Sequence, residues 1–157
     1  MSLLDGFTIR PASTADVDTL AAHRRAMFVD MGYKDAAALD SMTAKFRPWV
    51  RERMQSQEYL AWLAIAADGS IAAGAGLWLM DWLPHMIGTG VRRGNIVNVY
   101  TDEKFRRRGL ARCLMDTALL WCRENAIDTV ILHASPLGKD LYESMGFTQT
   151  NEMRIQL

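Results

Sequence analysis

A basic, glycine-containing turn is the part of this sequence best suited to bind an anion. It reads Arg106-Arg107-Arg108-Gly109-Leu110-Ala111, after a predicted strand (Asn95–Thr101) and at the start of a predicted helix (Gly109–Asn125). The first turn of a helix has unpaired N–H groups and a partial positive charge, which together bind phosphate or pyrophosphate. Gly109 has no Cβ, so a ligand can approach the backbone closely. The arginines add long-range attraction and can bind phosphate through two hydrogen bonds.

The charge distribution supports a local anionic ligand. Eighteen Lys and Arg balance eighteen Asp and Glu, so the formal net charge is zero. The segment from Arg92 to Arg112 nevertheless holds seven basic and two acidic residues, which gives it +5 and leaves −5 for the rest of the chain. A nucleic-acid-binding protein is more often basic overall and interleaves its basic residues with exposed aromatic ones. The pattern therefore favours one compact polyphosphate ligand over nucleic acid.

Length and composition indicate one folded domain, residues 1–157, in which half of the side chains are apolar. This composition excludes intrinsic disorder, and no run of about 18 apolar residues exists that would predict a membrane span. The first ten residues lack a basic region, so we expect no signal peptide and a cytoplasmic location. Cys113 and Cys122 are too far apart on one predicted helix to form a disulfide, and no residues nearby complete a metal site.

Hydrophobic periodicity predicts a mixed α/β domain. A first helix follows the N-cap candidates Ser13 and Thr14 and ends near Gly32, and Pro48 should kink a second helical region or start a new helix. A long loop is expected at Asp81–Gly94. The other predicted helices are Ala37–Met54, Gly109–Asn125 and Leu137–Met145. The predicted strands are Phe7–Arg10, Tyr59–Ala67, Ser70–Met80, Asn95–Thr101, Asp128–Ala134, Phe147–Thr150 and Met153–Leu157.

Two separated motifs resemble the GNAT superfamily of N-acetyltransferases. Arg106, Gly109 and Ala111 match the family's acetyl-CoA-binding pattern Gln/Arg-x-x-Gly-x-Gly/Ala. Downstream, Leu141-Tyr142-Glu143-Ser144-Met145-Gly146-Phe147 resembles the family's Leu-Tyr-x-x-x-Gly-Phe signature. One predicted helix and one predicted strand separate the motifs, as in the family, and the resemblance covers nearly the whole chain. It implies a twisted mixed sheet of about seven strands flanked by about four helices, splayed between the strands that end near Thr101 and Ala134.

The resemblance also implies how acetyl-CoA, the co-substrate, would bind. The pantetheine arm would pair with backbone groups of Val99, Tyr100 and Thr101. The pyrophosphate would be held by the turn, at Arg106, Arg107, Arg108, Gly109, Leu110 and Ala111. Ser135 occupies a position where many relatives have an asparagine that contacts the cofactor. A dinucleotide of the NAD type fits less well, because the glycine-rich Rossmann turn is absent.

The implied reaction moves an acetyl group to a primary amine of a small molecule or peptide by direct attack. The resemblance places Tyr142 as the general acid, and a phenol with an ordinary pKa of about 10 is protonated at neutral pH. Many relatives have a glutamate on the central strand as the general base, whereas this chain has Asn95 and Asn98 there. Candidates for the base are Asp81, His85, Glu103 and His133, whereas His23, on the first predicted helix, is expected at the surface. The missing carboxylate keeps a second function open, a non-catalytic acyl-CoA-binding or regulatory module.

The acceptor is not identified by the sequence. In the family the first two helices and the following loop form the acceptor site, and here they are rich in methionine and tryptophan. The acidic remainder of the chain suggests a cationic amine, a hypothesis that a basic lining of the cleft would contradict. The predicted strands at Phe147–Leu157 offer an edge through which a homodimer could form.

Overall fold

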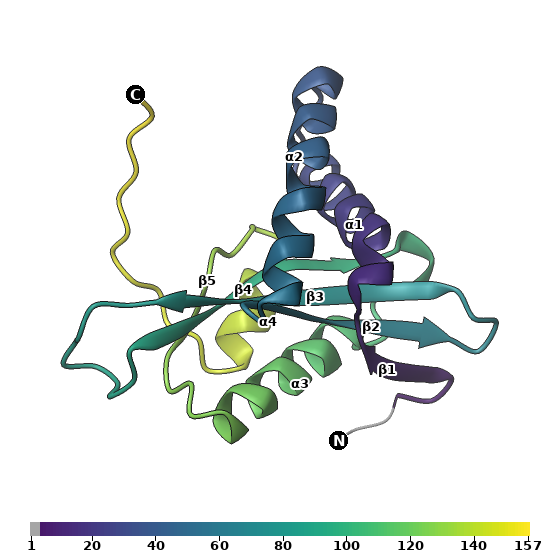
Figure 1. The fold of residues 1–157 in the computed structure, drawn as a ribbon. Coiled ribbons are helices and arrows are strands. Elements are labelled where there is room, and N and C mark those ends of the chain that lie inside the picture. Colours follow the sequence, from purple (N-terminus) through teal and green to yellow (C-terminus); the bar gives the residue numbers. More distant parts are fainter. Residues whose placement is uncertain (1–3) are drawn as a thin grey trace.

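A computed structural model describes residues 4–157, and within them five strands form one mixed sheet. The strand order follows the chain: β1 (Phe7–Pro11), β2 (Tyr59–Ala66), β3 (Ile71–Asp81), β4 (Arg92–Thr101) and β5 (Val130–Leu132). The first four strands are antiparallel to their neighbours, and β4 and β5 are parallel. Helices α1 (Val17–Asp30) and α2 (Ala36–Gln55) cover one face of the sheet, and α3 (Leu110–Glu124) and α4 (Lys139–Ser144) cover the other (Figure 1).

Apolar residues at helical spacing bury one core on each face of the sheet. On the α3 face, Leu110, Leu114 and Ala118 recur every four residues and pack against the sheet. On the opposite face, Phe46 and Val50 of α2 pack with α1 and with β2. Strands β2 and β3 are therefore covered on both sides, which explains their nearly continuous apolar sequences.

Two predicted strands at the end of the chain are absent, and this corrects the predicted strand number. Phe147–Thr150 and Met153–Leu157 form no strand, although both have β-type sequences. A strand needs a neighbouring strand for its backbone hydrogen bonds, and among the described residues neither segment pairs with one. The C-terminal segment instead extends away from the sheet (Figure 1). The α/β class, the mixed sheet and the four flanking helices of the described residues agree with the prediction.

Element boundaries differ from prediction in three further places. Strand β4 begins at Arg92, so the long loop covers residues 82–91 only, and β5 is shorter than the predicted Asp128–Ala134. Helix α2 continues through Pro48 without a new helix starting there. Proline lacks the N–H that would bond to the carbonyl of Ala44, but both residues are exposed, so water can satisfy that carbonyl. No helix among the described residues is long and apolar enough to cross a membrane.

A capping box starts the first helical region, and its N-cap is the predicted candidate Ser13. Ser13 Oγ accepts a hydrogen bond from the N–H of Ala15 at 3.3 Å, and Asp16 Oδ2 accepts one from the N–H of Ser13 at 2.8 Å. Arg10 donates two further bonds to the Asp16 carboxylate, at 2.7 and 2.9 Å. These bonds, led by those from Arg10, lower the pKa of Asp16 to about 2.

We expect this carboxylate to make folding stability depend on acidic pH. Because the folded pKa lies below the unfolded value of about 3.9, the stabilisation is complete above pH 4 and is lost as the pH falls through 2. It amounts to about 1 to 2 kcal/mol after allowance for the solvent-exposed side of Arg10. Urea unfolding of the wild type and Asp16→Asn at pH 6 and pH 2 checks this. The stability difference between the two proteins should shrink at pH 2, and an unchanged difference would contradict the role of Asp16.

Candidate functional site

The basic turn lies between β4 and α3, and its backbone forms a cradle. A short 3-10 turn (Glu103–Phe105) follows β4, and Gly109 is the N-cap of α3 with a φ of +78°. The first N–H of α3 with an intrahelical partner is that of Cys113, bonded to the Gly109 carbonyl at 3.0 Å. The N–H groups of residues 110–112 are thus directed out of the helix end, the arrangement that binds anions. A cavity of about 250 Å³, which we call the turn cavity, opens there; Thr101, Phe105, Arg106, Arg107, Gly109 and Ala111 contribute to its lining.

The three arginines of the turn have different surroundings. Arg106 donates to the Thr101 carbonyl at 3.1 Å and forms an ion pair with Asp30 at 2.6 Å, so its guanidinium ties the turn to the end of α1. The Arg108 guanidinium lies 5.7 Å from the centre of the Phe105 ring. Arg107 has a positive φ of 61°, is exposed, and forms no ion pair with a carboxylate of the described residues. Arg107 is therefore the arginine of the three best able to reach a ligand in the turn cavity.

The sheet opens beside the turn because β4 and β5 pair over a short length. Their paired residues are Gly94 to Ile96 on β4 and Val130 to Leu132 on β5, whereas β4 continues to Thr101. The predicted splaying between these two strands is confirmed. Val99, Tyr100 and Thr101, the residues predicted to pair with a pantetheine arm, lie in the part of β4 beyond the last pair with β5.

A bulge interrupts β4 at Asn98. Gly74 pairs with Tyr100 and Gly76 with Val97, so Asn98 and Val99 together face one residue of β3. Asn98 has a φ of +55°, a conformation that asparagine adopts more readily than most residues. The bulge turns the Asn98 side chain into a buried site between the sheet and the helices.

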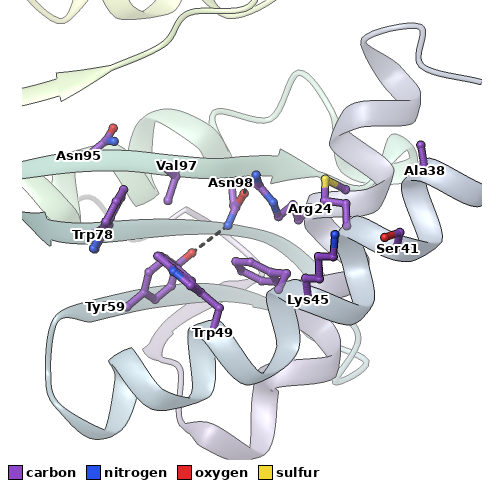
Figure 2. Close-up of a pocket in the computed structure, with 12 residues that line it drawn as sticks. Arg24, Ala38, Ser41, Lys45, Trp49, Tyr59, Trp78, Asn95, Val97 and Asn98 are labelled. Atoms are coloured by element: carbon purple, nitrogen blue, oxygen red, sulfur yellow. Dashed lines mark hydrogen bonds between the residues drawn. The ribbon is translucent and has the colours of Figure 1, made fainter. Parts of the chain in front are cut away.

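Two hydrogen bonds fix the Asn98 side chain in that site. The Arg24 Nη1 donates to Asn98 Oδ1 at 2.8 Å, and Asn98 Nδ2 donates to Tyr59 Oη at 2.9 Å (Figure 2). Burial raises the pKa of Tyr59 to about 12, so its hydroxyl is protonated at neutral pH. Gly76 makes room for this hydroxyl, since a Cβ there would lie 2.0 Å from Tyr59 Oη.

A larger cavity of about 620 Å³ lies beside this network, between the sheet and helices α1 and α2. We call it the α1–α2 pocket. Its volume is typical of small-molecule sites. Four aromatic side chains line it: Phe46 of α2 and, labelled in Figure 2, Trp49 of α2, Tyr59 of β2 and Trp78 of β3. The rings of Trp49 and Trp78 meet edge to face, with centres 5.2 Å apart.

The charged residues that line the α1–α2 pocket are Arg24 and Lys45, and its described lining contains no carboxylate. This basic lining contradicts the hypothesis that a cleft between these helices favours a cationic amine. Strand β4 contributes to both cavities, because Asn98 lines the pocket and Thr101 lines the turn cavity. Three residues of extended strand span roughly 10 Å, so one elongated ligand can occupy the turn while its far end reaches the pocket.

Tyr142 and Ser135 lie on the other side of the opening in the sheet. Tyr142, on α4, packs edge to face on Phe147 with ring centres 6.1 Å apart, and lies close to Gly138, where a Cβ would be 2.7 Å from its ring. Burial raises the pKa of Tyr142 above its ordinary value. Ser135 precedes α4, and its carbonyl accepts hydrogen bonds from the N–H groups of Gly138 and Lys139 at 3.0 and 3.1 Å.

The four candidates for a general base lie outside the α1–α2 pocket. Asp81, His85 and Glu103 are exposed, and His133 forms an exposed pair with Glu152 at 2.7 Å. No group of three or more His, Cys, Asp or Glu side chains in residues 4–157 is arranged to hold a metal ion.

Sequence reasoning named Asn95 only as a residue that replaces a family glutamate, and it misplaced His23. Asn95 lines the α1–α2 pocket and is 7% exposed, and its Oδ1 has no hydrogen-bond partner among the described residues. His23, expected at the surface, is buried against the Tyr100 ring, with centres 5.0 Å apart, and burial lowers its pKa to about 4. Its position three residues after Leu20 on the apolar face of α1 is a sequence signal that would have indicated this.

Comparison with known proteins places this arrangement among acetyltransferases. Residues 22–147 match the model of the acetyltransferase (GNAT) family. No curated protein sequence matches the chain at a significant level.

Solved structures share the fold over nearly the whole chain. A GCN5-related N-acetyltransferase from Ralstonia eutropha JMP134 is 35% identical, with a TM-score of 0.91 over 97% of this chain and 99% of the other. A predicted acetyltransferase from Clostridium acetobutylicum, solved with acetyl-CoA, is 24% identical, with a TM-score of 0.88 and 96% of each chain covered. Glucosamine-6-phosphate N-acetyltransferase from Arabidopsis thaliana is 18% identical, with a TM-score of 0.68 over 96% of this chain and 97% of the other.

Proposed function

The chain belongs to the GNAT acetyltransferase family, and from this premise we propose that it moves an acetyl group from acetyl-CoA to a primary amine of a small molecule or peptide by direct attack. The observation that carries the proposal is the path along β4, which joins an anion cradle to a large pocket. Residues 1–157 would act as one catalytic domain, and a cytoplasmic location stays a prediction.

The turn cavity and the open part of β4 would hold acetyl-CoA. We assign the pyrophosphate to backbone N–H groups of residues 107–111, with Leu110 and Ala111 in the first turn of α3 and the Arg107 side chain nearby, because the N–H of Arg106 already bonds to the Glu103 carbonyl. Arg106 and Arg108 would instead support the turn, because their guanidinium groups already contact Asp30 and Phe105. Val99, Tyr100 and Thr101 would pair with the pantetheine arm, and Ser135 would contact it from the other side of the opening.

Tyr142 would protonate the leaving thiolate. Its burial supports this role, because a raised pKa keeps the phenol protonated at neutral and moderately alkaline pH. Contacts with Phe147 and Gly138 fix the ring in one orientation. The step forms an amide bond, breaks the thioester bond, and moves one proton from the attacking amine to solvent and one from Tyr142 to the sulfur.

The amine would bind without a general base from the pocket lining. The described lining of the pocket holds no carboxylate that would stabilise a protonated ammonium, so the amine would bind in its neutral, nucleophilic form. Asn95 Oδ1, buried and without a partner among the described residues, would accept a hydrogen bond from the amine N–H. Water would receive the proton that the amine loses.

A panel of amines tests the proposed function. The wild type is incubated with acetyl-CoA and, in turn, with amino acids, aromatic amines, polyamines, aminoglycosides and peptides, and released CoA is measured as free thiol. We expect release above the amine-free rate with at least one class. If every class fails while CoA still raises the melting temperature, the second candidate is favoured, a non-catalytic acyl-CoA-binding module. The absence of a carboxylate from the described lining of the pocket is the observation that supports this alternative.

We further propose a homodimer that uses the C-terminal segment. Met153, Ile155 and Leu157 alternate with polar residues and are 95%, 79% and 105% exposed. Strand β5 is the last in the sheet, so one of its edges lacks a partner among the described residues and can accept a strand from a second copy.

The prediction for this dimer is that Ile155→Lys makes the protein monomeric in light scattering at micromolar concentration. A charge replaces a side chain that the second copy would bury. The control Leu120→Lys, on the exposed side of α3, should leave the mass unchanged. A monomeric wild type would refute the dimer.

A further inference from the structure

Two cations in the α1–α2 pocket lack an anionic partner. Arg24 comes from α1 and Lys45 from α2. The ion pairs of the described residues involve other basic side chains, and neither Arg24 nor Lys45 takes part in one. The phenol beside Arg24, that of Tyr59, is itself protonated at neutral pH. A ligand anion is the missing partner that this arrangement indicates.

Arg24 in particular is placed to bind an anion. Its guanidinium lies 5.0 Å from the centre of the Phe28 ring and 5.4 Å from that of Phe46. The hydrogen bond from its Nη1 to Asn98 holds the group in one orientation and leaves its other N–H groups for a ligand. Removing a guanidinium from water without a carboxylate is costly, and a bound anion would offset that cost.

The end of the pocket away from Arg24 and Lys45 offers a hydrogen-bond acceptor instead of a cation. Asn95 lines that end, and its buried carbonyl oxygen lacks a hydrogen-bond partner among the described residues, while its Nδ2 has only a weak contact with Met80 Sδ at 3.7 Å. Asn95 and Trp78 lie at one end of the pocket, and Arg24 and Lys45 lie toward the other (Figure 2). Asn95 and Asn98 are roughly 10 Å apart along β4, so a ligand that meets both ends is longer than an α-amino acid head group.

We propose that the acceptor is an amine that carries a carboxylate at the opposite end of an aromatic body. Arg24 and Lys45 bind the carboxylate, Asn95 accepts a hydrogen bond from the amine, and the body packs on Trp49, Tyr59 and Trp78. This inference rests on the proposed function, which it deepens by naming the substrate class.

Matched amines test the substrate class. The probes are 4-(2-aminoethyl)benzoate, 2-phenylethylamine, which lacks only the carboxylate, and phenylalanine, in which amine and carboxylate are adjacent. We expect kcat/KM for the first to exceed those of the other two by 10-fold or more, as befits a hydrogen bond to a charged group. Equal or better use of 2-phenylethylamine would overturn the inference and leave the proposed acetyltransferase activity intact. A preference for phenylalanine would overturn the assigned spacing.

Variants locate the carboxylate site. Arg24→Gln should lower kcat/KM for 4-(2-aminoethyl)benzoate 10- to 100-fold, mainly through KM, and should leave 2-phenylethylamine unaffected. Lys45→Gln should show the same selective loss for 4-(2-aminoethyl)benzoate, but a smaller one. Because Lys45 is exposed, this variant should fold and so still tests the site if Arg24→Gln does not fold. The control is Arg25→Gln, which neighbours Arg24 but pairs with Asp40 outside the pocket lining. An equal loss of kcat/KM for both amines would show that Arg24 acts by holding Asn98 in place, and would overturn the inference.

A binding measurement separates the two proposals when turnover fails. With CoA present, 4-(2-aminoethyl)benzoate should raise the melting temperature of the wild type and not of Arg24→Gln. A melting-temperature increase in the wild type alone, without turnover of any amine, would refute the proposed acetyltransferase activity. It would still support an anion site at Arg24. No thermal shift together with no turnover refutes both.

Discussion

Replacement of Tyr142 by phenylalanine is expected to lower kcat about 100-fold, the size of effect typical when a general acid is removed. The variant loses only the hydroxyl. The ring contacts with Phe147 and Gly138 stay, so the fold and the affinity for CoA should be retained. Steady-state kinetics with the best amine of the panel, together with a CoA titration, measure the two quantities separately.

The pH profile distinguishes a proton donor from a packing residue. Burial raises the pKa of Tyr142, so in the wild type the loss of kcat caused by its deprotonation should begin at a higher pH than for a tyrosine with an ordinary pKa. Tyr142→Phe should lack this loss. The matched control is Tyr33→Phe, at an exposed tyrosine beyond the end of α1. Unchanged kcat in Tyr142→Phe would show that another group protonates the thiolate.

Local sequence signals predicted the strand, turn and helix around the turn cavity, because each signal depends on residues close together in the chain. The apolar spacing of Leu110, Leu114 and Ala118 marks α3, and the structure begins that helix one residue after Gly109. The N-cap candidate Ser13 is likewise a local signal, and in the structure it forms a capping box with Asp16, three positions later. The strand, turn and helix that form the turn cavity are therefore readable from the sequence alone.

Features that depend on distant residues were not predictable in the same way. The α1–α2 pocket takes its two cations from different helices and its aromatic wall from α2, β2 and β3, and no spacing in the sequence reports their convergence. The net charge of −5 outside the basic segment suggested an acidic cleft, whereas this pocket is lined by Arg24 and Lys45. Total charge cannot say where charges meet. The prediction of the last two strands was wrong for a related reason. Alternation of apolar and polar residues shows which face of a strand would be buried, but it does not show which strand would pair with it.

Gly109→Ala is expected to weaken CoA binding about 10- to 100-fold, equivalent to the loss of one charge-assisted hydrogen bond or more. Gly109 lines the turn cavity with a φ of +78°, and the nearest side-chain atom to a Cβ there belongs to Leu4, at 3.7 Å. A methyl group would therefore project into space that the pyrophosphate would need beside the first N–H groups of α3. Isothermal titration with CoA measures the affinity, and kcat at saturating acetyl-CoA should change little.

Backbone strain has to be separated from the loss of the binding surface, because alanine with a positive φ costs about 1 to 2 kcal/mol of stability wherever it occurs. Gly69→Ala provides this control. Gly69 has a φ of +84°, also has open space around its Cβ position, and lines neither the turn cavity nor the α1–α2 pocket. Both variants should lose similar stability in urea unfolding, and only Gly109→Ala should lose affinity for CoA. Equal CoA affinities in the two variants would show that the pyrophosphate is not bound at the start of α3, and would remove the structural basis for the path along β4.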